Sequence, residues 1–426
     1  MDQREFKGMQ IAATMPVRRS TNGWLVPSQA GHGSYTVSPV NQAFVDSGAA
    51  RQFDCTCPDY ELRGLPCKHV FAVEMTVRRE YNSDGEMVAE NVKVTYTQDW
   101  KAYNAAQCAE KETFMPMLAD LCSTIANPPQ GRGRPRLPMS DMAFTAVAKV
   151  YAGLSARRFD SDVREATAKG LTDQDPHFNS VLRYLRSPEM TPVLRSLVEL
   201  SAMPLKGVET DFAADSTGFT TCRFVRWYDE KWGHAKSKRE WVKLHAMTGV
   251  RTNIVTAVEM THNYGTDSSD YRQFMPLLTQ TAANFELRDV LADKAYSGKT
   301  NLQAVADAGG TPFIPFKGSP AVPGLPLYQP LPWASAWLKM YHLFSYQRDT
   351  FLSRYHQRSN VETTFSMIKA KFGDSLRSKS EIGQFNEVLC KVIAHNLCVL
   401  IACIHEIGLD VPQFANHGSA SSEGVA

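Results

Sequence analysis

The pattern of apolar residues changes at residue 211, and this change limits the possible folds more than any other feature. Residues 140–205 carry apolar side chains at helical spacing. The chain that follows reads as three consecutive strands, at 211–220, 241–249 and 253–262. Further elements are predicted in the order helix, strand, helix, strand, at 271–283, 290–293, 302–308 and 312–315. This order predicts an α/β domain with a mixed sheet flanked by helices.

The remainder of the chain divides into regions of different texture. Residues 1–110 mix short strand-like runs with turn residues, and residues 111–139 read as a helix followed by a linker rich in Pro and Gly. Residues 140–210 are predicted to be a helical region that precedes the α/β domain at 211–410. The small, polar end of the chain, 411–426, is predicted to be disordered.

Charge and hydropathy restrict the location of the protein. The 426 residues include 46 Lys and Arg against 44 Asp and Glu, which excludes a strongly basic or acidic tail. Met1–Ala13 lacks the apolar core of a secretory signal. The most apolar run, Leu397–Ile404, is far shorter than the roughly 20 residues of a membrane span. We therefore expect a cytoplasmic protein with no membrane partner.

Cysteine and histidine cluster in the N-terminal region. Cys55 and Cys57 form one pair, and Cys67 and His69 form a second pair after a short spacer. Four such ligands suit one structural Zn²⁺ in tetrahedral coordination, because no position is left for a catalytic water. The alternative is four unrelated buried residues. The pattern resembles a SWIM-type zinc finger, which binds either DNA or protein. The other six cysteines are predicted to be packing residues in the core.

The linker carries a short arginine motif. Residues 131–136 read Gly-Arg-Gly-Arg-Pro-Arg and contain Arg132, Arg134 and Arg136. An extended motif of this type resembles an AT-hook, which lies in the narrow minor groove of A·T-rich DNA. A flexible basic linker is the simpler alternative.

One acid lies between two basic residues in the segment that begins at Tyr355. Arg358 and Glu362 are four residues apart, and Lys369 follows seven residues later, so a single helix would place the three on one face. An ordinary amphipathic helix with charge pairs would show the same spacing. Two further acids, Asp215 and Asp293, lie in apolar strand contexts, where an unpaired carboxylate is costly and a divalent cation would offset that cost.

These residues together resemble the DDE transposases of bacterial insertion sequences, in the group with a Tyr-Arg-Glu-Lys signature. Tyr355, Arg358, Glu362 and Lys369 reproduce the spacing of that signature, and Asp215 and Asp293 match the first and second acids. Residues 312–317, ending in Lys317, resemble the stretch after the second acid. The resemblance covers residues 130–410. It implies a ribonuclease-H-like fold, preceded here by a helical region and a small zinc-finger domain.

The resemblance also implies the chemistry. Asp215, Asp293 and Glu362 are expected to be the catalytic acids and to hold two Mg²⁺ or Mn²⁺ ions, which promote DNA cleavage and strand transfer. Tyr355, Arg358, Lys369 and Lys317 are expected to contact DNA. The partners are the terminal inverted repeats of the element and target DNA, with a homodimer assembled on them at the bacterial nucleoid. A catalytically silent DNA-binding protein and a ribonuclease-H-like nuclease without strand transfer are the alternatives.

Two basic segments support a DNA partner despite the near-neutral total charge. Residues 354–379 contain six basic and two acidic residues, and residues 223–243 contain seven and three. The second segment also contains Trp227, Trp232 and Trp241 between its charged residues. We interpret it as a hairpin that contacts phosphates. A solvated hairpin with tryptophans packed beneath it is the alternative.

Overall fold

A computed structural model describes the following parts of the chain: residues 4, 7–8, 11–12, 15, 17–21, 23–28, 33–39, 53–81, 87–92, 99–127, 129, 131–133, 135–221, 241–263, 268–316 and 335–415. The chain forms two compact units, Met1–Asp99 and Trp100–Ala426. The boundary at residue 110 that the sequence suggested falls inside a long helix, α4 (Trp100–Ser123), which belongs to the second unit.

The first unit is built on a small antiparallel sheet. Its strands lie in the order β1, β2, β3, β4, at Arg18–Ser20, Gly23–Pro27, Ser34–Pro39 and Phe53–Cys55. The helices α2 (Pro58–Arg63) and α3 (Lys68–Thr76) follow, and a hairpin of β5 (Val77–Tyr81) and β6 (Met87–Val92) completes the unit. Trp24, Val26, Val37 and Phe53 are buried together with the clustered cysteines. Since so small a core buries little apolar surface, this unit depends on an additional stabilising element.

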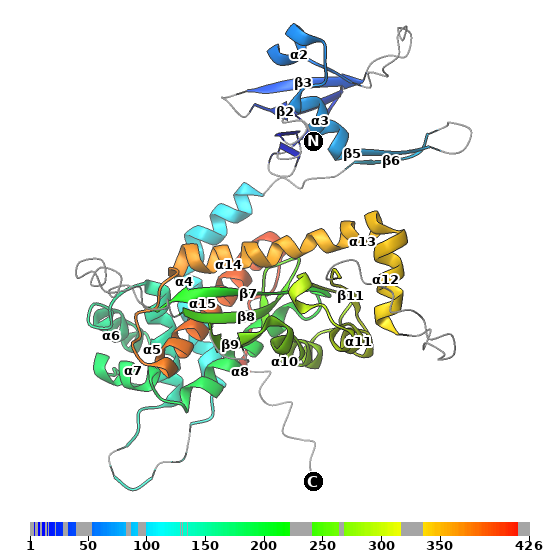
Figure 1. Cartoon of the computed structure of the whole chain (residues 1–426). Coiled ribbons are helices and arrows are strands. Elements are labelled where there is room, and N and C mark those ends of the chain that lie inside the picture. The colour runs from blue at the N-terminus through cyan, green and yellow to red at the C-terminus, as the bar shows by residue number, and fades with distance from the viewer. Residues whose placement is uncertain are drawn as a thin grey trace, which may run out of the picture. The chain divides into compact units, whose positions relative to one another are not determined.

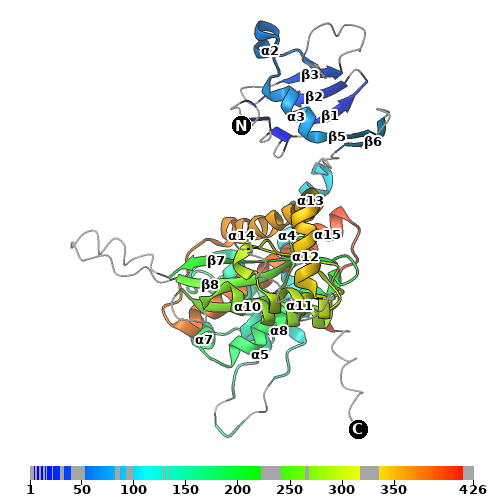
Figure 2. The same cartoon turned by 45° about the vertical axis from the view of Figure 1, so that its right-hand side comes forward.

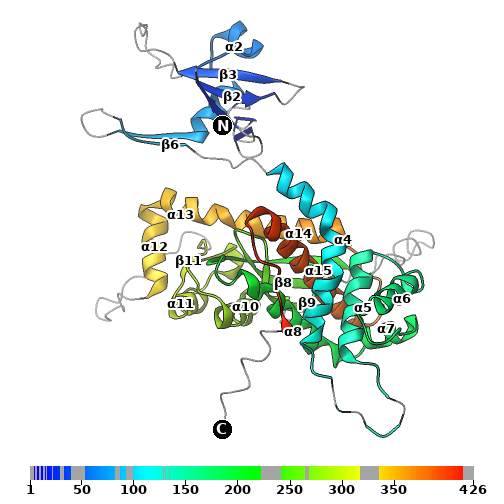
Figure 3. The ribbon, with the colours of Figure 1, turned by 180° about the vertical axis from the view of Figure 1, so that it is seen from behind.

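A helical region opens the second unit. It consists of α4, then α5 (Met139–Ala152), α6 (Asp160–Ala168), α7 (Phe178–Leu185), α8 (Met190–Ala202) and the short η2 (Met203–Leu205). The C-terminal helix α15 (Glu381–Glu406) packs against α4, α5 and α8. Figure 3 shows α4 and α5 beside α15. The helices at 139–202 therefore share a continuous core with the sheet domain.

A five-stranded sheet forms the centre of the second unit (Figure 1). Its strands are β7 (Asp211–Thr220), β8 (Trp241–Gly249), β9 (Val255–His262), β10 (Asp289–Ala292) and β11 (Thr311–Phe313). The spatial order is β11-β10-β7-β8-β9, with β7, β8 and β9 antiparallel and β10 and β11 parallel to β7. This is the mixed α/β, ribonuclease-H-like architecture that the sequence predicted.

Helices flank the sheet in the order that the sequence suggested. Between β9 and β11 lie α10 (Asp270–Asn284), the short η4 (Lys294–Tyr296) and α11 (Lys299–Asp307). After β11 come α12 (Ala336–Tyr346), α13 (Arg348–Tyr355), η5 (His356–Arg358) and α14 (Ser359–Phe372). Figure 2 shows α12, α13 and α14 following one another along the sheet domain. Both α10 and α14 pack against β7 and β8.

Three expectations need correction. The segment from Tyr355 to Lys369 is not one helix, because η5 separates α13 from α14 at residues 356–358. Residues 411–415 were assigned to a disordered tail, but Phe414 is buried and its N–H donates to a carboxylate oxygen of Asp120. A single apolar anchor outside any helix or strand gives no periodic pattern in the sequence. Cys108 is exposed rather than a core residue, and Cys222 lies outside the described residues.

One described helix, α15, has the length and composition of a membrane span. However, 78% of its apolar window is buried inside the structure. It is the central helix of this unit, as expected from its apolar run.

Candidate active site and zinc site

The register of the sheet brings the first two acids together. Strand β10 runs parallel to β7, and Ala292 is paired with Ala214. The next residue of β7 is Asp215, and the residue directly after β10 is Asp293. They are therefore side by side, although 77 residues separate them in the sequence. Asp293 lies directly after β10 and accepts a hydrogen bond from the N–H of Lys294 as the cap of η4.

Arg358 links the third acid, Glu362, to Asp215. One guanidinium nitrogen of Arg358 donates to Oδ2 of Asp215 at 2.9 Å, and the other donates to Oε1 of Glu362 at 2.8 Å. Arg358 and Asp215 are about one-fifth exposed, whereas the side chain of Glu362 is 59% exposed. The guanidinium thus pairs with two of the three acids, and its single positive charge leaves a net negative charge on the group.

The electrostatics of Asp215 match a cation site. Burial raises the pKa of Asp215, and the negative charges of Asp293 and Glu362 raise it further, while the Ser216 N–H and Arg358 act in the opposite direction. One buried carboxylate and two more that raise its pKa form a donor set of the type that binds Mg²⁺ or Mn²⁺, so the residues present fit such an ion.

Two further side chains of the signature line this site. Lys369 extends from α14 to β7, where its Nζ donates to Oγ1 of Thr217 at 2.6 Å. The ring of Tyr355 lies 5.9 Å from the guanidinium carbon of Arg358. The turn η5 follows Tyr355 and ends at Arg358. It does not separate the group, because Arg358 still forms an ion pair with Glu362 in α14. Tyr355, Arg358, Glu362 and Lys369 thus surround Asp215 and its strand.

Sequence reasoning did not select Thr217 or Asp270 in this region. Thr217 points to the same side of β7 as Asp215, because side chains alternate along a strand and the two are two residues apart. Asp270, at the start of α10, lies near His245 and Lys243 of β8. An acid at a helix start and a histidine within an apolar strand were the available signals, but neither indicates a partner by itself.

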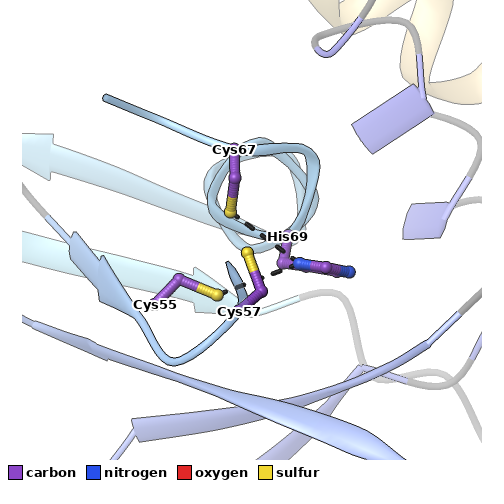
Figure 4. Close-up of side chains that lie close together, drawn as sticks. All are labelled: Cys55, Cys57, Cys67 and His69. Carbon is purple, nitrogen blue, oxygen red and sulfur yellow. Dashed lines mark hydrogen bonds between the residues drawn. The ribbon is translucent and has the colours of Figure 1, made fainter. Parts of the chain in front are cut away.

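The four zinc-ligand candidates converge in the first unit (Figure 4). Cys55 ends β4, Cys57 precedes α2, Cys67 precedes α3 and His69 lies in its first turn. All four side chains are buried, and their ligand atoms lie within 4.8 Å of one another. Tetrahedral zinc with Zn–S bonds of about 2.3 Å needs sulfur atoms roughly 4 Å apart, which this cluster matches closely.

The polar atoms of this cluster point toward a common centre. Nδ1 of His69 lies 3.9 Å from Sγ of Cys55 and 3.8 Å from Sγ of Cys67. Burial raises the pKa of Cys57, and a hydrogen bond with Cys67 together with burial raises that of Cys55. The same bond lowers the pKa of Cys67. Three buried thiols that shift one another's pKa values fit a cation, which would allow all three to ionise.

The other predicted DNA contacts are less defined. Arg132 and Arg136 are exposed, and Arg136 lies 3.5 Å from Glu189 and lines a cavity of about 250 Å³ with Arg183 and Tyr184. Arg134, Lys317 and residues 222–240, which hold most of the basic tryptophan-containing segment, lie outside the described residues. Trp241 is described, and its ring lies against Gly218 of β7, where any larger side chain would collide with it.

The sheet order and the acids on β7, β10 and α14 define a ribonuclease-H-like domain of the type that acts on nucleic acids. Family comparison gives the particular family: residues 206–397 match the transposase DDE domain, and residues 35–77 match the SWIM zinc finger. No curated protein matches the chain. The chain therefore carries a transposase DDE domain together with a SWIM zinc finger, which confirms both resemblances and supports a role in transposition.

Proposed function

We propose that the protein is a transposase that binds the ends of its insertion element and catalyses cleavage and strand transfer of DNA. The observation that carries this proposal is the placement of Asp215 beside Asp293, with Glu362 linked to Asp215 through Arg358. The match of residues 206–397 to the transposase DDE domain supports it.

Asp215, Asp293 and Glu362 would hold the divalent cations, as two Mg²⁺ or Mn²⁺ ions. When bound, such ions lower the pKa of water and stabilise the leaving oxygen at phosphorus. Oxygen ligands favour these ions over zinc. The burial of Asp215 excludes much of the solvent, which strengthens its attraction for a cation.

The basic residues of α14 and η5 would hold the DNA backbone. A guanidinium such as that of Arg358 can bind a phosphate with two parallel hydrogen bonds, whereas Lys369 supplies a point charge. In the protein without DNA, Arg358 pairs with Asp215 and Glu362, and Lys369 pairs with Thr217. When DNA and cations enter, the side chains of Arg358 and Lys369 would exchange these partners for phosphate oxygens. Tyr355 packs beside Arg358 and would orient it.

The proposed reaction has two steps. Water attacks the phosphorus at the element end, the bond from phosphorus to the 3′ oxygen breaks, and that oxygen leaves as a 3′-hydroxyl. The hydroxyl then attacks a target phosphodiester, which forms a new bond and releases a target 3′-hydroxyl. The same three acids serve both steps, so one site is sufficient.

The remaining regions would add DNA contacts and assembly. Arg132, Arg134 and Arg136 would enter a minor groove, and Lys317 would contact the backbone. Two protomers would assemble on the two ends of the element at the bacterial nucleoid. One structural Zn²⁺ would hold the finger through Cys55, Cys57, Cys67 and His69.

Glu362→Gln tests the catalytic assignment, with Glu259→Gln as a matched control. Glu259 is paired with Arg195 at the edge strand β9 and lies outside the proposed site. We expect Glu362→Gln to retain DNA binding and to lose strand cleavage in Mg²⁺ by a factor on the order of 1,000, equivalent to roughly 4 kcal/mol. Cleavage by Glu362→Gln at the wild-type rate would remove Glu362 from the site.

The same assay separates the alternatives when it includes a pre-cleaved end with a free 3′-hydroxyl. A transposase cleaves intact ends and joins pre-cleaved ends to target DNA. A nuclease without strand transfer would cleave but not join, and a silent DNA-binding protein would do neither. Inverted repeats that flank the coding region would independently support the assignment as a transposase.

A further inference from the structure

A second polar cluster lies behind the active site, on the opposite face of the sheet. Side chains alternate along β7, so Asp215 and Thr217 face α14 while Ser216 faces α10. Ser216 is paired with His245 of β8, and Lys243 lies two residues before His245 on the same face. Asp270, the first residue of α10, packs against this group.

The carboxylate of Asp270 lies close to both basic side chains of the cluster. Its Oδ1 lies 2.8 Å from Nζ of Lys243 and 3.2 Å from Nδ1 of His245, whose side chain is completely buried. Nε2 of His245 lies 3.0 Å from Oγ1 of Thr261 on β9. Although burial acts against it, the close approach of His245, Lys243 and Ser216 holds the pKa of Asp270 below its usual range. Asp270 is therefore an ionised, partnered carboxylate directed away from the three acids.

The cluster is connected to the strand that presents the first acid. The N–H of Ser216 donates to Oδ1 of Asp215 at 2.8 Å, while the hydroxyl of Ser216 interacts with Asp270 on the other face. One residue of β7 therefore contacts the acid on one side and the cluster on the other.

The segment that carries the second acid packs through Tyr296 against α10, the helix that begins with Asp270. Tyr296 follows Asp293 by three residues in η4, is 1% exposed and packs against Phe274 of α10 with ring centroids 5.7 Å apart. Burial raises the pKa of Tyr296, as do the charges of Asp270, Asp215 and Asp293, so its hydroxyl stays neutral. The side-chain amide of Asn301 donates to the carbonyl of Tyr296 at 2.9 Å and holds this turn in place.

We propose that Asp270 is a positioning residue of the active site: through its contacts with Lys243, His245 and Ser216, and through the packing of α10 on Tyr296, it holds the backbone segments that carry Asp215 and Asp293 at the spacing a divalent cation requires. This inference rests on the proposed function, because it concerns how the same acids are held. Asp270 itself does not bind the cation, since it lies on the other face and is paired there. A displacement of about 1 Å in ligands is sufficient to impair such a site.

Mn²⁺ binding to the full-length protein tests this inference without DNA or turnover. Asp270→Asn keeps the shape of the side chain but removes its charge. We expect the dissociation constant for Mn²⁺, measured from the free-ion signal in electron paramagnetic resonance, to rise about tenfold, within the range known for residues that orient metal ligands. Asp270→Glu should restore part of the affinity. A dissociation constant within twofold of wild type for Asp270→Asn would overturn the proposal.

Two comparison variants make this result specific. Asp289→Asn removes an equal charge at the start of β10, where Asp289 faces Arg354, and should leave the Mn²⁺ affinity unchanged. If Asp289→Asn weakens binding as much as Asp270→Asn, the effect is one of net charge and the positioning role is wrong. Asp215→Asn removes a proposed ligand. If even Asp215→Asn leaves Mn²⁺ binding intact, the proposed function fails, whereas a loss in Asp215→Asn alone overturns only the role of Asp270.

A neutral variant decides the question if Asp270→Asn does not fold. Ser216→Ala breaks the same connection without changing the charge, and we expect it to weaken Mn²⁺ binding several-fold. If Asp270→Asn does fold, the two effects in the double variant should be less than additive, because both act through one contact. Wild-type affinity in Ser216→Ala, with a folded protein by circular dichroism, would overturn the proposal.

Discussion

Single buried polar residues determine how the turn between β8 and β9 is held. Asn253 in this turn has a positive φ of 66°, a conformation that Asn tolerates better than most residues. Nε2 of His395 donates to the carbonyl of Asn253 at 2.9 Å, and the hydroxyl of Thr364 donates to its side-chain oxygen at 3.1 Å. His395 is 3% exposed, and burial lowers its pKa to about 4. The histidine is therefore neutral in the folded protein.

This buried histidine predicts a pH dependence of stability. Because the pKa of about 4 in the folded protein lies below the ordinary histidine value of 6.5, the unfolded chain takes up the proton first as the pH falls, and stability is lost between these two values. From pH 7.5 to pH 5.0 the loss from His395 should be about 2 kcal/mol. Denaturant unfolding of His395→Gln at both pH values should show a correspondingly smaller decrease than wild type. An equal decrease in both proteins would contradict this assignment.

At the scale of elements, α15 organises the second unit through polar contacts as well as through its apolar surface. Asn396 is fully buried, accepts from the N–H of Val255 at 2.9 Å and donates to the carbonyl of Val255 at 2.8 Å. Its amide also donates to the hydroxyl of Ser201 in α8 at 2.9 Å. One side chain thus joins α15, α8 and β9, which explains why a helix apolar enough for a membrane is instead the centre of this unit.

Asn396→Ala should destabilise the second unit strongly. The change leaves both backbone groups of Val255 buried without these partners, at about 1–3 kcal/mol each, so we expect a loss of about 2–5 kcal/mol in the free energy of unfolding. His405→Ala, at an exposed position of the same helix, should change it by less than about 0.5 kcal/mol. Denaturant unfolding followed by circular dichroism measures both. Equal effects of the two changes would show that the contacts of Asn396 contribute little.

At the scale of the whole molecule, the two units differ in charge and in the way they are stabilised. Residues 1–99 contain 10 basic and 12 acidic residues, whereas residues 100–426 contain 36 and 32. Zinc bound by three thiolates would make the first unit more negative still. The excess of basic residues therefore lies in the second unit, which contains the DDE domain.

Loss of zinc should unfold the first unit alone. Structural zinc contributes on the order of 10 kcal/mol or more, which is comparable to the entire stability of a small domain. Cys67→Ala should lose stoichiometric zinc by metal analysis, and its calorimetric transition for residues 1–99 should disappear while that of residues 100–426 persists. A chelator applied to the wild-type protein should give the same result. If the purified wild-type protein contains no zinc, the finger assignment is wrong.

The sequence by itself predicted the order of strands and helices in the sheet domain, and it supplied the candidate zinc ligands and the acids of the DDE resemblance. Local patterns were sufficient for these predictions. The periodicity of apolar residues indicates a helix or a strand, and the spacing of Cys and His indicates a zinc finger. The break at residues 356–358 was not predicted, because the apolar and charged spacing of a helix continues across it. The buried Phe414 was missed because a single apolar residue outside a helix or strand belongs to no periodic pattern.

Only the tertiary structure decided which residues meet. Asp215 and Asp293 are adjacent because β10 pairs with β7 in one register, and a shift of one residue would turn one acid to the opposite face. Arg358 reaches Asp215 across 143 residues, and Asp270 reaches His245 across the sheet, through packing of helices that periodicity does not specify. Contacts between distant residues depend on strand register and helix packing, which are properties of the whole chain rather than of any segment.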